Sequence, residues 1–76
     1  MSQVITINPE ILSGTPVFTG TRVPIKNLFD YLETGESVDE FLIDFPSVTK
    51  EQAIQILATA EKLLLTATET LNENFA

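Results

Sequence analysis

The hydrophobic and polar positions between residues 49 and 71 follow one helical period over a long stretch for so short a chain. This stretch has no Gly or Pro and consists mostly of residues that favour a helix. Thr49 and Gln52 have the spacing of a capping box, which predicts that a helix begins at residue 50. The apolar positions that recur at alternating steps of four and three are Ala53, Leu57, Ala60, Leu64, Ala67 and Leu71. We predict a helix over 50–71 and a frayed tail over 72–76.

This predicted helix is longer than a small core can cover. About 22 residues at roughly 1.5 Å each give a rod of about 33 Å, and a helix that is apolar around most of its surface needs cover. The small Ala side chains leave room for a second copy or a partner to approach closely. We therefore predict a dimer or partner interface, with fraying after Leu65 as the alternative. Its residues are Ala60, Leu64, Ala67 and Leu71.

Two shorter apolar patterns precede the long one. The first begins at Pro24, which suits the first turn of a helix, and ends before Gly35, so it predicts a helix over 24–34. The second begins at a capping box from Ser37 to Glu40 and ends before Pro46, which predicts a helix over 38–45. The apolar positions that would face a common core are Ile25, Leu28, Phe29, Leu32, Val38, Phe41, Leu42 and Phe45.

The first 23 residues show strand and turn signals instead. Short extended pieces at 4–7, 17–18 and 21–23 are separated by Pro and Gly. Together these elements predict a single, mainly α domain. We expect a trihelical helix-turn-helix, homeodomain-like or winged-helix-like, with short N-terminal β-strands and a long C-terminal helix.

The amino-acid composition excludes several kinds of site chemistry. The 76 residues include no Cys and no His, which removes disulfides, thiol chemistry, the common zinc sites and the usual general base. We expect no enzymatic activity, no cofactor, no metal and no small-molecule substrate. No signal peptide or long apolar run is visible, so we expect a cytoplasmic protein without a membrane partner. A chain this short buries too little surface for much stability, which favours oligomerisation.

The charge is acidic and concentrated. Eleven acidic residues face four basic ones, and between residues 27 and 49 there are six acids and no base. These six are Asp30, Glu33, Glu36, Asp39, Glu40 and Asp44. A basic partner is the natural complement of such a surface. The alternative is that they form ordinary solvated helix faces that keep a small protein soluble.

A nucleic-acid interface would use the start of the long helix in a major groove. The side chains available there and for phosphate contacts are Arg22, Lys26, Lys50, Gln52, Gln55 and Thr59. Gln52 has a competing role as a helix cap, Gln55 and Thr59 could simply be a solvated stripe, and Arg22 could pair with Asp44. The net charge of −7 opposes DNA binding by the chain on its own.

Four motifs resemble a known family. They are Asn8-Pro9-Glu10-Ile11, the run from Gly14 to Ile25 with its Gly-Thr-Arg-Val-Pro centre, Gly35-Glu36-Ser37, and Asp44-Phe45-Pro46. In this order, over residues 5 to 60, the chain resembles the family known as domain of unknown function 433. Ser13 and Thr15 stand where the family often has Gly and Lys, and Phe45 replaces a Tyr. The lost Lys weakens a phosphate-binding role for that loop.

The resemblance implies a trihelical helix-turn-helix protein, often a dimer, of a kind regarded as a VapB-type antitoxin encoded beside a PIN-like ribonuclease toxin. Our first hypothesis is thus a dimeric antitoxin-like binding protein of a toxin-antitoxin pair. It would neutralise a PIN-like ribonuclease partner, and the complex would bind operator DNA. The alternative is a stand-alone helix-turn-helix transcriptional regulator, and a third reading is a structural dimer without a ligand.

Overall fold

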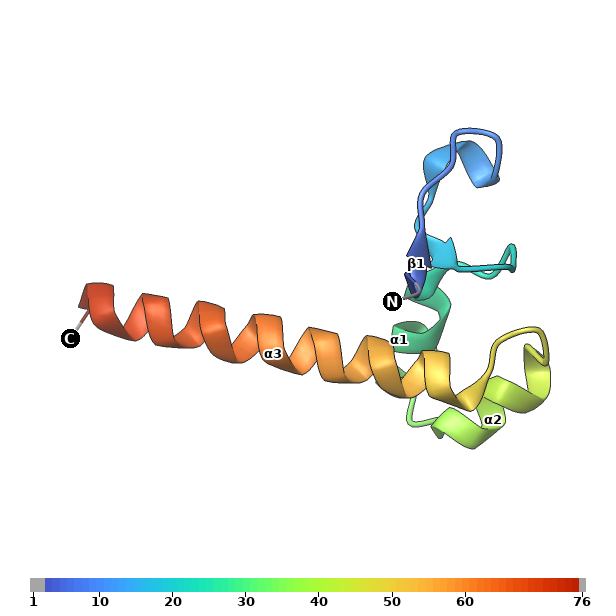
Figure 1. The fold of residues 1–76 in the computed structure, drawn as a ribbon. Coiled ribbons are helices and arrows are strands. Elements are labelled where there is room, and N and C mark those ends of the chain that lie inside the picture. The colour runs from blue at the N-terminus through green and yellow to red at the C-terminus, as the bar shows by residue number, and fades with distance from the viewer. Residues whose placement is uncertain (1–2, 76) are drawn as a thin grey trace.

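The computed structural model of the chain describes residues 3–75, with side chains as far as residue 69. In chain order the elements are β1 (Ile5–Thr6), the 3-10 turn η1 (Leu12–Gly14), β2 (Val17–Phe18), α1 (Ile25–Glu33), α2 (Val38–Asp44) and α3 (Lys50–Phe75). Figure 1 shows a small head, made by the strands, α1, α2 and the beginning of α3, from which α3 projects as a single rod. The prediction of a mainly helical fold with short N-terminal strands and a long C-terminal helix is confirmed.

Both predicted capping boxes form. The Thr49 hydroxyl accepts a hydrogen bond from the Gln52 amide at 3.1 Å, and Gln52 Oε1 accepts one from the Thr49 amide at 3.0 Å. At the start of α2 the Ser37 hydroxyl accepts from the Glu40 amide at 3.1 Å, and Glu40 Oε1 accepts from the Ser37 amide. These contacts satisfy amides that the first turn of a helix leaves unpaired, so each helix begins where the sequence predicts.

The end of α3 differs from the expectation. The prediction placed it at residue 71, with a frayed tail over 72–76, but the backbone stays helical to Phe75 and residue 76 lies outside the described residues. Neither Gly nor Pro occurs beyond residue 71, so nothing in the sequence stops the helix there.

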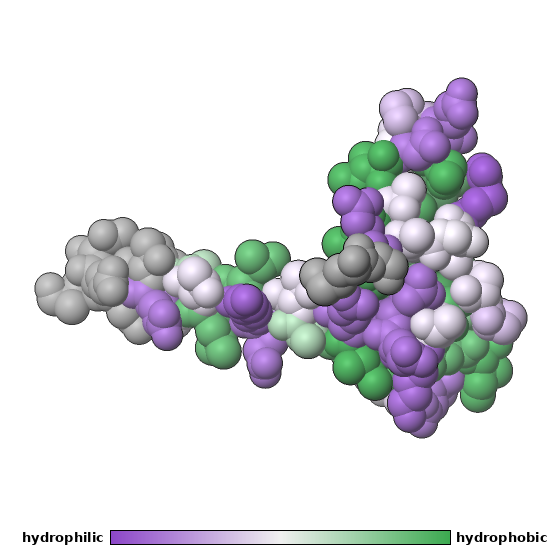
Figure 2. Space-filling view, in the orientation of Figure 1, coloured by the Kyte–Doolittle hydropathy of each residue, from purple (hydrophilic) through white to green (hydrophobic). Residues whose placement is uncertain are grey.

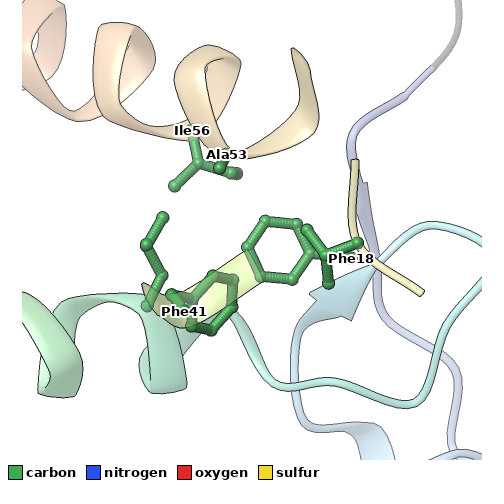
Figure 3. Close-up of a cluster of buried hydrophobic side chains, with 6 residues drawn as sticks. Phe18, Phe41, Ala53 and Ile56 are labelled. Atoms are coloured by element: carbon green, nitrogen blue, oxygen red, sulfur yellow. The ribbon is translucent and has the colours of Figure 1, made fainter. Parts of the chain in front are cut away.

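One apolar cluster joins the three helices to the strands. Its buried members are Phe18, Leu28, Phe41, Val48, Ala53 and Ile56. Figure 3 shows Ala53 and Ile56 reaching from α3 towards Phe41 and Phe18. The rings of Phe18 and Phe41 lie 5.9 Å apart, and the ring of Tyr31 packs edge-on to Phe41 at 5.4 Å. Phe41 is fully buried at the centre of this cluster.

The N-terminal strands are shorter than predicted. β1 and β2 pair antiparallel with Ile5 opposite Phe18, and the predicted strand over 21–23 is not one. Thr21 explains this, because its hydroxyl donates to the Phe18 carbonyl at 2.8 Å and accepts from the Val23 amide at 3.0 Å. Those bonds close a tight turn, and the chain beyond it meets β2 only in an isolated antiparallel bridge between Val17 and Pro24.

Candidate interaction surfaces

The acidic side chains of α1 and α2 form the most concentrated charge on the head. Glu40 and Asp44 lie one turn apart on the same side of α2, and Glu36, two residues before the helix, shares a hydrogen bond with Glu40. We call these three residues the acidic row, and all three are exposed. Within residues 3–69 no basic side chain forms an ion pair with any of them.

Crowding within the acidic row perturbs its ionisation. The pKa of Glu36 is raised above its usual value, because its carboxyl group shares a hydrogen bond with Glu40 and is repelled by the charges of Glu40 and Asp44. The same hydrogen bond, together with the Ser37 amide, lowers the pKa of Glu40. The uncompensated negative charge therefore makes this face favourable for a cationic group.

Asp44 also connects the two short helices. The Tyr31 hydroxyl donates a hydrogen bond to Asp44 Oδ2 at 2.6 Å, and this bond raises the pKa of Tyr31. Asp44 is thus not the partner of Arg22 that the sequence suggested. Arg22 is exposed and forms no hydrogen bond or ion pair with any side chain of the described residues. No sequence pattern indicates the Tyr31 contact, which depends on how α1 packs beside α2.

The six predicted DNA-contacting residues do not form one surface. Lys26 is held by Asp30, with Nζ 2.8 Å from each carboxylate oxygen. Lys50, Gln55 and Thr59 are exposed on α3. Gln55 and Thr59 lie one turn apart on the same side, whereas Lys50 lies about 140° around the helix from Gln55 at 100° per residue.

The Gln52 side chain forms hydrogen bonds within the head itself. Its Oε1 completes the cap of α3, and its Nε2 donates to the backbone carbonyl of Thr19 at 2.9 Å, across the core from a loop 33 positions away. Thr19 is itself tied to the strands through its hydroxyl, 2.8 Å from that of Thr6. Both ends of the Gln52 amide are thus used within the chain, so its side chain is not free to bind a base edge.

The predicted partner interface on α3 is divided between covered and uncovered positions. Ala60 is half-buried near the head, whereas Leu64 is 67% exposed and Ala67 is exposed. Leu71 lies outside the residues whose side chains are described. The neighbours Leu63 and Leu65 are 66% and 57% exposed. Figure 2 shows separate apolar patches between polar ones along the rod.

No cleft or ion site adds to these surfaces in the part of the chain that the structure describes. Residues 3–69 contain no pocket and no group of three or more acidic side chains placed to hold a metal ion. None of the described helices has the length and apolar character needed to cross a bilayer. The candidate sites are therefore two open surfaces, the acidic row and the outer half of α3, whose described side chains at 61–69 are all exposed.

Comparison with known proteins identifies relatives without a described activity. Residues 5–60 match the family described as Protein of unknown function (DUF433). A stretch of 50 residues, 66% of this chain, is 40% identical to the uncharacterized protein y4eO of Sinorhizobium fredii (strain NBRC 101917 / NGR234). That stretch spans 23% of the length of y4eO. No solved structure matches the chain with significance.

Proposed function

The chain belongs to the DUF433 family of proteins of unknown function, and we propose that it is an antitoxin-like binding protein of the cytoplasm whose acidic row masks a basic, RNA-handling partner. The partner in this proposal is a PIN-like ribonuclease of a toxin-antitoxin pair. The observation that carries the proposal is the acidic row, in which three exposed carboxyl groups have no basic neighbour to balance them.

A ribonuclease must attract the phosphates of RNA, so its substrate groove carries Lys and Arg side chains. Carboxylates one helical turn apart on α2 present a line of negative charge that competes for such side chains. Complementary charge also speeds association and sets the orientation of the two proteins. The head thereby blocks the groove without any catalytic group of its own.

Binding of operator DNA by the complex is the second part of the proposal, with a stand-alone regulator as the alternative. Gln55 and Thr59, exposed one turn apart on the same side of α3, support it, as does the short connection between α2 and α3. Gln52 is excluded from base reading by its contacts with Thr49 and Thr19. The charge of −7 means that a basic partner would have to supply part of the phosphate attraction.

The test is a binding titration against any PIN-like protein encoded beside this chain, with two variants of equal charge. One variant neutralises the acidic row with Glu36→Gln, Glu40→Gln and Asp44→Asn, which keep acceptors for the Ser37 amide and the Tyr31 hydroxyl, and the control combines Glu51→Gln, Glu61→Gln and Glu69→Gln on α3. Each removes three of the eleven acidic groups.

We expect the first variant to bind about tenfold or more weakly, and the affinity of the wild type to fall with added salt, whereas the control retains its affinity. Equal losses in the two variants would mean that only net charge matters. No complex with the neighbouring PIN-like protein would contradict the proposal outright.

A further inference from the structure

The chain exposes more surface than a protein of its mass needs to. Its accessible surface is 5603 Å², whereas a compact monomer of 8.4 kDa exposes about 4,600 Å². The radius of gyration is 14.4 Å, against about 11 Å for a compact domain of this length. The excess of about 1,000 Å² is similar to the roughly 800 Å² that each partner contributes to a stable interface. The projecting α3 in Figure 1 is the most evident source of this excess.

The uncovered surface continues the face that α3 uses inside the head. Ala53 is buried in the core and Ala60 is half-buried. Ala67 follows at the same step of seven, so it lies on nearly the same side of the helix but is exposed, with Leu64 beside it. The apolar seam of α3 is thus continuous, and the head covers its first half. No other described residue of the chain covers its second half.

The order of large and small residues along this seam favours one way of pairing it with a copy of itself. Small and large side chains alternate as Ala60, Leu64, Ala67 and Leu71. In a parallel pair each residue would face its own counterpart, which puts two leucines in one layer and two alanines in the next. In an antiparallel pair Leu64 faces Ala67 of the second copy, so each layer holds one large and one small side chain and the two helices keep an even spacing.

The position of the head also favours an antiparallel pair. In a parallel pair, the second copy of α3 would have to run along the side of Ala53 and Ile56, where the head already packs. In an antiparallel pair, the copy instead brings only its C-terminal end to that level, and its own head lies at the far end of the rod.

We propose that the outer half of α3 binds a second copy of this chain antiparallel, with Leu64 facing Ala67 across the pair. This pairing does not involve the acidic row, so the two proposals fail separately. Within one chain, the head packs against α3 only as far as about Ala60. Burial in the pair would therefore also stabilise the helix beyond that residue.

The test measures spin-label distances in the full-length protein with a single Cys at either of two matched positions. Glu51→Cys and Glu69→Cys suit this purpose, because the chain has no other Cys and both side chains are exposed. The two positions are five helical turns apart and hence lie on the same side of α3.

In the antiparallel pair the two labels at 51 are offset along the axis by about 44 Å, and those at 69 by about 10 Å. We expect the distance at 51 to be longer than that at 69 by about 15 Å or more. Equal distances would show a parallel pair, and the absence of any intermolecular distance would show no pair; either result overturns the proposal.

Exchange of the seam residues tests the mixed layers. Leu64→Ala alone truncates a leucine in both copies and is expected to weaken dimerisation by roughly a hundredfold. Combining it with Ala67→Leu restores one large and one small side chain in each layer, so the double variant should dimerise more tightly than Leu64→Ala. If the double variant dimerises no better than Leu64→Ala, the proposed facing of Leu64 and Ala67 is wrong. Circular dichroism checks that each variant keeps its helices.

Discussion

Replacing Gln52 separates its structural role from the base-reading role that its position on α3 suggests. Gln52→Ala removes two hydrogen bonds, the one from Nε2 to the Thr19 carbonyl and the one that Oε1 accepts from the Thr49 amide. A neutral hydrogen bond contributes about 0.5–1.5 kcal/mol, so the loss of both should cost about 1–3 kcal/mol. For a domain of this size that corresponds to a fall in Tm of roughly 5–20 °C.

Two further variants give this measurement its controls. Gln52→Glu keeps an oxygen for the cap but sets a carboxylate oxygen against the Thr19 carbonyl in place of the donor, so it should melt below the wild type even though the cap is retained. Gln55→Ala removes the same kind of side chain from an exposed position on the same helix, and should change stability by no more than about 0.5 kcal/mol.

Thermal unfolding followed by circular dichroism, with all variants at one protein concentration, provides the comparison. If Gln52→Ala and Gln55→Ala melt within about 2 °C of each other, the bond between α3 and the Thr19 loop contributes nothing and the reasoning is refuted.

Three other variants test separate parts of the account. Ser13 has a left-handed φ of 56°, a conformation that costs a residue with a side chain about 1–2 kcal/mol, so Ser13→Gly should raise the Tm; an unchanged or lower Tm would count against strain at this turn. The pKa of Glu36 is raised in the folded protein above its unfolded value of 4.5. The contribution of protonated Glu36 to folding stability is therefore fully present below pH 4.5 and is lost as the pH rises through the folded pKa. Glu36→Gln, which keeps a donor towards Glu40, should therefore melt higher than the wild type at pH 7 and converge with it below pH 4.5, and a constant difference across that range would contradict the shared hydrogen bond. In a mobility-shift assay with the partner complex on its upstream DNA, Lys50→Ala with Gln55→Ala should abolish the shift, and retention of the shift would remove α3 as the DNA-contacting helix.

The helices could be predicted from the sequence because their signals are local. Each capping box joins residues three positions apart, and the apolar spacing of α1 and α2 depends only on the helical repeat. The C-terminal limit of α3 was harder to place, since a helix without Gly or Pro at its end has no local stop signal.

The contacts between elements could not be predicted in the same way. Gln52 meets Thr19 across 33 positions, and no periodicity or spacing links the two. Charge alone suggested Arg22 as the partner of Asp44, whereas the structure pairs Asp44 with the hydroxyl of Tyr31, brought there by the packing of α1 on α2. Residue type alone therefore did not show which side chains are already bound by others in the chain.

By contrast, the exposed apolar surface of α3 could be predicted from the sequence. The surplus of apolar positions over what a small core can cover was visible in the sequence, and Leu63, Leu64 and Leu65 are indeed exposed. Which of these leucines belongs to the interface depends on the direction of the seam, which the buried Ala53 and half-buried Ala60 define.

Sedimentation equilibrium at low micromolar concentration tests the association most directly, with Leu64→Glu and Leu65→Glu as a matched pair of neighbouring exposed leucines. We predict a mass of twice 8.4 kDa for the wild type and for Leu65→Glu, and a single 8.4 kDa chain for Leu64→Glu, whose charge would lie inside the seam. A wild-type protein that sediments as one chain while α3 remains helical along its length would contradict the account, as would identical behaviour of the two variants.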